Sequence, residues 1–187
     1  MSVGHAAREL ELLDALSELE PVAHTEPVWR AVREGRDPVQ GHPSAGRWDP
    51  GRFDVIYTAL APEGAVAEIH FHLSRQPVFP SKLRFALYEV RVRTERTLKL
   101  ADMAALTALG VEEGRYREIL YHRTQEIGDA AYFLGFDGLT APSARWPCQN
   151  LVLFTERLEP AHLEAGEPAW IDWQVWQQKL KDRPGTG

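Results

Sequence analysis

Residues 44–68, which read SAGRWDPGRFDVIYTALAPEGAVAE, carry a cation, a phenol and a carboxylate on three successive predicted elements. Arg47 lies in a turn, Tyr57 in a predicted strand and Glu68 in a predicted helix. A guanidinium can hold a small anionic ligand, and a carboxylate can stabilise a nearby positive charge. Such groups are costly to bring into an apolar pocket unless they serve a ligand or one another. They are the candidate functional core, although Arg47 and Glu68 could instead form a structural ion pair and Tyr57 could belong to the core.

Three elements must position these side chains. Residues 33–52 are interrupted repeatedly by glycine and proline, which predicts a long loop, and loops of this length in compact domains are often functional. The β-branched and aromatic residues at 54–60 predict a strand. Pro62 is favoured in the first turn of a helix, and in the helix that follows Glu68 borders the apolar stripe.

The sequence EIHFH at residues 68–72 raises the question of a metal site. On a helix, however, His70 and His72 point about 200° apart. Only Glu68 and His72 share a face, and a catalytic metal usually takes three protein ligands. We therefore predict no metal site. Cys148 is the single cysteine, and without a placed histidine it is a weak candidate for a nucleophile.

Composition indicates an ordinary globular protein. A chain of 187 residues suits one domain, so we expect residues 1–187 to form a single unit. The acidic N-terminal segment is unlike a signal peptide, and there is no apolar run long enough to span a membrane. A net charge of −6 without a basic block argues against direct nucleic-acid binding. The single cysteine fits a cytoplasmic location.

The remaining elements frame this core. Residues 5–20 predict an amphipathic helix, which either packs on the domain or forms a partner surface. Residues 28–32 predict a strand in which Arg30 shares a face with Val28 and Val32. Arg30 therefore reaches solvent at a sheet edge or points into a polar pocket.

The second half of the chain mixes short strands with helices, which favours an α+β fold over a doubly wound sheet. Residues 115–134 predict the longest helix, and residues 168–181 predict a tryptophan-rich helix that packs on the domain. The other expected elements are strands at 85–93, 97–100 and 150–155 and a helix at 102–109.

The chain resembles the RES domain family in the order and spacing of a set of landmark residues. The resemblance runs from about Val28 to Phe154, so that residues 28–155 form the core and the two terminal helices are additions to it. The landmarks are Trp29-Arg30, Gly46-Arg47-Trp48, Ile56-Tyr57, Ala67-Glu68, Pro142-Ser143-Ala144-Arg145 and Asn150-Leu151-Val152-Leu153-Phe154. The loop before Arg47 reads HPSAGRW, which is less glycine-rich than the family pattern.

The resemblance implies a fold similar to ADP-ribosyltransferases: two small, roughly perpendicular β-sheets with surrounding helices and NAD bound in the cleft. It implies that Glu68, Arg47 and Arg30 are catalytic and that Arg30, Arg47, Tyr57, Ser143 and Asn150 bind the substrate. Cleavage of the nicotinamide–ribose bond builds positive charge on the sugar, which a fixed carboxylate would stabilise. The arginines would hold the pyrophosphate, Tyr57 would stack on nicotinamide, and Ser143 would hydrogen-bond nearby.

The function implied by the resemblance is the toxin of a type II toxin–antitoxin system that depletes NAD, as a glycohydrolase or a phosphorylase. NAD would be the substrate, and no separate cofactor is expected. The expected partner is an Xre-type helix-turn-helix antitoxin, with a homodimer possible in the complex and no membrane association. Two alternatives stay open: transfer of ADP-ribose to a protein, and a non-catalytic module that binds a partner.

Overall fold

The computed structural model describes residues 8–184, and within that range nine strands form one continuous hydrogen-bonded sheet. The strand order is β1-β5-β6-β7-β3-β2-β4-β8, and β9 pairs with β4. Only β5 and β6 run parallel among these pairs. The strands are β1 (Val22–His24), β2 (Val28–Arg33), β3 (Val55–Ala59), β4 (Phe85–Val92), β5 (Thr94–Lys99), β6 (Gly138–Pro142), β7 (Gln149–Phe154), β8 (Leu163–Ala165) and β9 (Ala169–Trp170).

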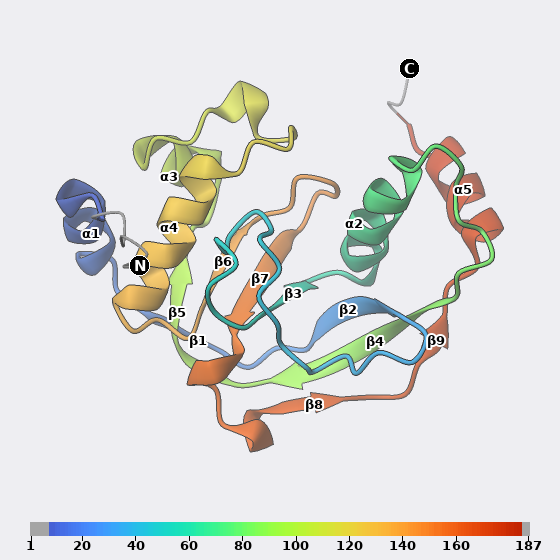
Figure 1. Cartoon of the computed structure of the whole chain (residues 1–187), viewed down its shortest axis with the longest axis horizontal. Coiled ribbons are helices and arrows are strands. Elements are labelled where there is room, and N and C mark those ends of the chain that lie inside the picture. The colour runs from blue at the N-terminus through green and yellow to red at the C-terminus, as the bar shows by residue number, and fades with distance from the viewer. Residues whose placement is uncertain (1–7, 185–187) are drawn as a thin grey trace, which may run out of the picture.

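The sheet has two groups of strands, and they meet between β2 and β3. That junction has a single paired position, Trp29 opposite Ala59. Figure 1 shows β2, β4 and β8 running in a clearly different direction from β5, β6 and β7, so the sheet is strongly curled. The α+β prediction is confirmed. The strands form one connected network, where the family resemblance implied two sheets.

Side chains alternate between the two faces of the sheet, and each face has its own core. On β3, Val55 and Tyr57 face the larger cluster, which includes Trp48 and residues from the helices α1 (Leu10–Ser17) and α4 (His122–Phe133). Ile56 faces the opposite cluster, together with buried residues of β2, β4 and β7. This alternation decides which polar side chains can meet.

The helix α2 (Pro62–Ser74) packs on the second group of strands. Its residue Ala65 contacts the cluster of Trp29, Ala31 and Ala59. The C-terminal helix α5 (Trp173–Lys181) covers α2, where Trp173 and Trp176 are buried; Figure 1 shows the two helices side by side.

The predicted starts of the two terminal helices need correction. The N-terminal helix is shorter than residues 5–20: α1 begins at Leu10, and residues 5–7 lie outside the described range. The tryptophan-rich helix begins at Trp173, because Asp172 caps it by accepting the backbone N–H groups of Gln174 and Val175. Residues 169–170 form β9 instead of a helical turn.

The prediction of a helix over residues 115–134 was wrong for residues 115–121. Its observed part, α4, begins only at His122, and α2 is longer, with 13 residues. Arg47 donates to the backbone carbonyls of Tyr116 and Glu118, so these carbonyls accept a side chain where a helix would need N–H donors. The short helix α3 (Met103–Ala108), capped by Asp102, agrees with its prediction.

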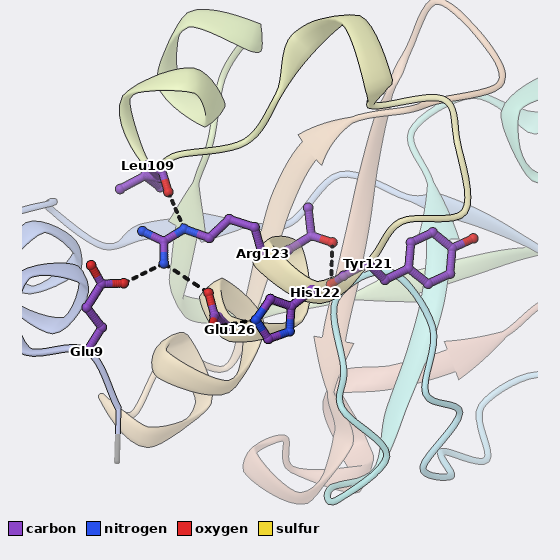
Figure 2. A network of polar contacts seen from close by, with 7 residues as sticks. Glu9, Leu109, Tyr121, His122, Arg123 and Glu126 are labelled. Carbon is purple, nitrogen blue, oxygen red and sulfur yellow. Dashed lines mark hydrogen bonds and ion pairs between the residues drawn. The ribbon is translucent and has the colours of Figure 1, made fainter. Parts of the chain in front are cut away.

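The start of α4 is anchored by Arg123. Its guanidinium donates to Glu9, to Glu126 and to the carbonyl oxygen of Leu109 (Figure 2). These contacts join α4 to the residue before α1 and to the end of α3. Figure 2 shows the ring of Tyr121, the residue before α4, pointing away from this network. Within residues 8–184, no helix has the length and apolar character needed to cross a membrane.

Candidate active site

Glu68 lies in the middle of α2, half-buried, and one of its carboxylate oxygens accepts two hydrogen bonds. The donors to Oε1 are Oγ of Ser143 at 3.2 Å and Nδ2 of Asn150 at 3.3 Å. Ser143 follows β6, and Asn150 lies near the start of β7, opposite Ala59 of β3. The structure therefore brings together three of the predicted site residues from separate parts of the chain.

Ser143 also organises the turn that follows it. Its hydroxyl oxygen accepts the backbone N–H groups of Arg145 and Trp146 at 3.1 and 3.2 Å. Its own backbone N–H donates to the carbonyl of Cys148 at 2.8 Å. The hydroxyl is thus fully used: it donates to the carboxylate and accepts twice from the turn.

Arg47 lies between two aromatic rings. Its Cζ is 4.7 Å from the ring centroid of Tyr116 and 4.8 Å from that of Tyr121. The guanidinium also donates to the carbonyl oxygens of Tyr116 at 2.6 Å and of Glu118 at 3.5 Å. Burial raises the pKa of Tyr116, while Arg47 lowers it and Glu68 raises it. Arg47 and Glu68 therefore both lie within electrostatic range of the same phenol.

Tyr57 uses its hydroxyl within the protein. The hydroxyl donates to Asp49 Oδ1 and accepts the backbone N–H of Trp48 at 2.9 Å. Burial, followed by the charge of Asp49, raises the pKa of Tyr57 well above its usual value. The loop lies so close that a Cβ on Gly46 would sit 2.7 Å from the hydroxyl oxygen. Stacking of this ring on nicotinamide stays a prediction.

Asp49 was missed by sequence reasoning, yet it holds the loop that carries Arg47. The side chain is fully buried, and it accepts from the backbone N–H groups of Ser44, Ala45, Gly46 and Gly51 and from two hydroxyls. Burial alone would raise the pKa of Asp49, but these hydrogen bonds outweigh burial and lower it. The signal was an aspartate in a glycine-rich turn, which commonly accepts nearby backbone N–H groups.

Arg30 lies on the other face of the sheet from Glu68. It alternates with Trp29 and Ala31, which face α2, and its guanidinium donates to the carbonyl of Pro38. Burial lowers the pKa of Arg30 to about 10. The structure therefore does not bring Arg30 into contact with the carboxylate, and its role with a substrate stays a prediction.

Arg145 was quoted as a landmark but not predicted as a site residue. Its guanidinium carbon lies 3.3 Å from the ring centroid of Phe71, the residue that precedes His72 on α2. Burial lowers the pKa of Arg145, the charge of Glu68 raises it, and the charge of Arg47 lowers it. The pKa of His72 is lowered by burial and is also influenced by Glu68, Arg145 and Arg47. These four charged or titratable groups form one electrostatic cluster.

Two hollows of about 230 and 200 Å³ lie beside α4, and neither is lined by Glu68. The first lies between α1, α4 and residues 50–52, and the second lies where α4 begins. Within residues 8–184, no group of three or more His, Cys, Asp or Glu side chains could hold a metal ion.

Comparison with known proteins places this geometry in a family. The RES domain profile matches residues 27–174. The NAD(+) phosphorylase MbcT of Mycobacterium tuberculosis and its counterpart in Mycobacterium bovis are each 22% identical over 161 residues, which cover 82% of this chain and 87% of the relative. A chain in the crystal structure of the M. tuberculosis MbcT–MbcA toxin–antitoxin complex superposes with a TM-score of 0.81 at 22% identity, covering 92% of this chain and 98% of that one.

Proposed function

This chain belongs to the RES domain family, and on that premise we propose that it is an NAD-depleting toxin that cleaves the nicotinamide–ribose bond. Its relatives from Mycobacterium are named NAD(+) phosphorylases, which supports inorganic phosphate as the acceptor. In this reaction the bond between the ribose carbon C1′ and nicotinamide nitrogen breaks, and its electron pair leaves with neutral nicotinamide. A phosphate oxygen then bonds to C1′.

The observation that carries the proposal is the way Glu68 is held. Ser143 and Asn150 both donate to Oε1, while Oε2 accepts no hydrogen bond from any side chain or N–H group in the described part of the chain. A carboxylate fixed in this way presents one oxygen to a sugar carbon that becomes cationic, and a preorganised charge is most effective where it need not move during reaction. Because nicotinamide leaves as a neutral molecule, a general acid is not required.

The other predicted site residues are part of the same proposal. Arg47 would direct its charge at the pyrophosphate, which requires the guanidinium to exchange a backbone carbonyl for a phosphate oxygen. Tyr57 would stack on nicotinamide, and Ser143 would hydrogen-bond the nicotinamide or ribose side. Asn150 and Arg30 are the remaining members of the predicted substrate-binding set. NAD enters as a substrate, without a separate cofactor.

The fold and partner follow the same reasoning. We propose that the two groups of strands correspond to the two roughly perpendicular sheets of an ADP-ribosyltransferase-like fold. The likeness to a chain from a toxin–antitoxin complex supports an antitoxin as the partner. An Xre-type antitoxin, a homodimer within the complex and a cytoplasmic location remain parts of this proposal.

The test follows NAD and its products after purified protein is added, with and without inorganic phosphate. We expect NAD loss that depends on phosphate, with a phosphorylated ADP-ribose as product. Glu68→Gln keeps the shape and removes the charge, so turnover should fall at least about a hundredfold, equivalent to roughly 2.7 kcal/mol of barrier.

Glu63→Gln is the matched control, because Glu63 lies on the same helix in an exposed ion pair with Lys179. Its turnover should stay near that of the wild type. Labelled protein in an added cell extract, with little free product, would instead indicate ADP-ribose transfer. A wild-type protein that leaves NAD intact would refute the enzymatic proposal.

A further inference from the structure

Arg145 is a guanidinium beside Glu68 that has no acceptor of its own. Its Nε atom is buried without a hydrogen-bond partner, and across residues 8–184 no carboxylate lies within ion-pair distance of its side chain. A buried polar group left unpaired destabilises the protein, and more so when it is charged. A ligand that supplies an acceptor would remove this cost.

The two arginines that were predicted to bind the substrate already have partners within the protein. Arg47 donates to two backbone carbonyls and lies between two tyrosine rings. Arg30 donates to Pro38 on the opposite face of the sheet. Of the three, Arg145 is the one whose charge is both close enough to act on Glu68 and uncommitted to the protein.

The surroundings of Arg145 hold its guanidinium in one orientation. The plane is packed over Phe71 at 3.3 Å from the ring centroid, and the backbone N–H of Arg145 donates to Ser143 Oγ at 3.1 Å. Ser143 in turn donates to Glu68. A stacked guanidinium keeps its donor edges free, and those edges match two oxygens of a phosphate group.

We propose that Arg145 binds a phosphate group next to Glu68. The inference rests on the proposed function and adds to it a residue that the predicted substrate-binding set lacked. The phosphate group belongs either to the pyrophosphate of NAD or to the inorganic phosphate that accepts the sugar. Both present the same chemistry to the guanidinium, and the kinetic constants for the two substrates distinguish them.

The test compares Arg145→Gln and Arg145→Lys with the wild type, with Arg117→Gln as the matched control. Arg117 is exposed and close enough to influence Arg145, so its replacement removes the same charge from the same region. Charge-assisted hydrogen bonds of about 1.5–3 kcal/mol correspond to roughly a 10- to 100-fold rise in the Michaelis constant for Arg145→Gln. Arg145→Lys should lie in between, and Arg117→Gln should change the constants less than about threefold.

A rise confined to the constant for NAD assigns the pyrophosphate, and a rise confined to that for inorganic phosphate assigns the acceptor. Calorimetric titration with ADP-ribose and with inorganic phosphate gives the same comparison without turnover, so it tests Arg145 even if wild-type protein leaves NAD intact. If Arg145→Gln does not fold, Arg145→Lys carries the comparison. Unchanged constants and affinities in the folded variants, or no binding of either ligand to the wild type, would overturn the proposal.

Discussion

Ser143 donates its hydroxyl hydrogen to Oε1 of Glu68 across 3.2 Å, although the two residues are 75 positions apart in the sequence. The same hydroxyl oxygen accepts the N–H groups of Arg145 and Trp146. One atom therefore links the orientation of the carboxylate to the turn that carries the uncommitted guanidinium.

Replacing Ser143 with alanine should reduce activity more than stability. The change removes one of two donors to Glu68, so we expect kcat/KM for NAD to fall about 10- to 100-fold, while the free energy of unfolding falls by about 1–2 kcal/mol. Steady-state kinetics and urea unfolding measure the two effects. Ser74→Ala, at the exposed end of the same helix, should change neither. Equal losses in both variants would contradict the assigned role.

Replacing Asn150 with aspartate should shift the pH dependence of turnover. The new carboxylate would lie about where Nδ2 now donates to Glu68, at 3.3 Å, and two such carboxylates cannot both ionise easily. One pKa of the pair therefore rises, and the acid limb of the pH profile of kcat/KM should move to higher pH. Asn150→Ala removes the donor without adding charge, so its acid limb should move less than that of Asn150→Asp. Identical profiles for the two variants would count against the contact.

Tyr57→Phe should destabilise the fold. The change removes the donor to buried Asp49 and the acceptor for the N–H of Trp48, while the ring stays in place. Leaving such groups unpaired costs roughly 1–3 kcal/mol, so the urea midpoint should fall clearly. Tyr132→Phe is the control, because that hydroxyl bonds an exposed carboxylate. If Tyr57→Phe were as stable as wild type, the hydroxyl would not hold the loop.

Asp49→Asn should make the protein less stable at neutral pH, and the deficit should shrink in acid. The folded pKa of Asp49 is lowered from 3.8, so the ionised side chain stabilises the fold fully above about pH 3.8. That contribution is lost as the pH falls through the lower folded pKa. Thermal unfolding of both proteins between about pH 7 and pH 3 measures the gap in Tm. A gap that stays constant with pH would show that the charge of Asp49 is not involved.

Gly128→Ala should be strongly destabilising, although alanine is normally about 1 kcal/mol better than glycine within a helix. A Cβ at this position of α4 would lie 1.7 Å from the backbone carbonyl oxygen of Trp48, which cannot move aside as a flexible side chain would. We expect a loss of more than about 2 kcal/mol in urea unfolding. Gly114→Ala, where nothing lies within 4 Å of the added Cβ, should be close to neutral. A neutral Gly128→Ala would mean that α4 and the loop are not in close contact.

Local patterns predicted strands at the positions of β2, β3, β4, β5 and β7, but they missed the short strands β1, β8 and β9. Ser143 and Asn150, which donate to Glu68, were expected from the family resemblance and not from local patterns. Alternation placed Arg30 on one face with Val28, and the structure agrees. The pattern could not say which face α2 would cover, because that depends on how β2 and β3 pair. The predicted site therefore included a cation on the far face, and it left out Arg145, whose approach to Glu68 is set by the turn after β6.

The segment at residues 115–121 shows the second limit of sequence reasoning. Its apolar residues recur at helical spacing, yet Tyr116 donates its hydroxyl to the carbonyl of Pro142 and its backbone carbonyl accepts from Arg47. Both are tertiary contacts with distant residues. The contact with Arg47 occupies a backbone carbonyl that a helix would pair with an N–H group. Asp49 shows the same limit within a single turn. The turn itself could be recognised from the sequence, but the number of hydrogen bonds that Asp49 accepts could not.

The single paired position between β2 and β3 affects how Glu68 and its two donors are held together. Glu68 lies on α2, which packs mainly against β2 and also contacts Ala59 of β3. Its two donors, Ser143 and Asn150, come from the turn after β6 and from β7. Within the described sheet only Trp29 and Ala59 pair across this junction, so few backbone hydrogen bonds fix the angle between the two groups of strands. A change in the angle between the two groups would move the carboxylate relative to Ser143 and Asn150 at the same time.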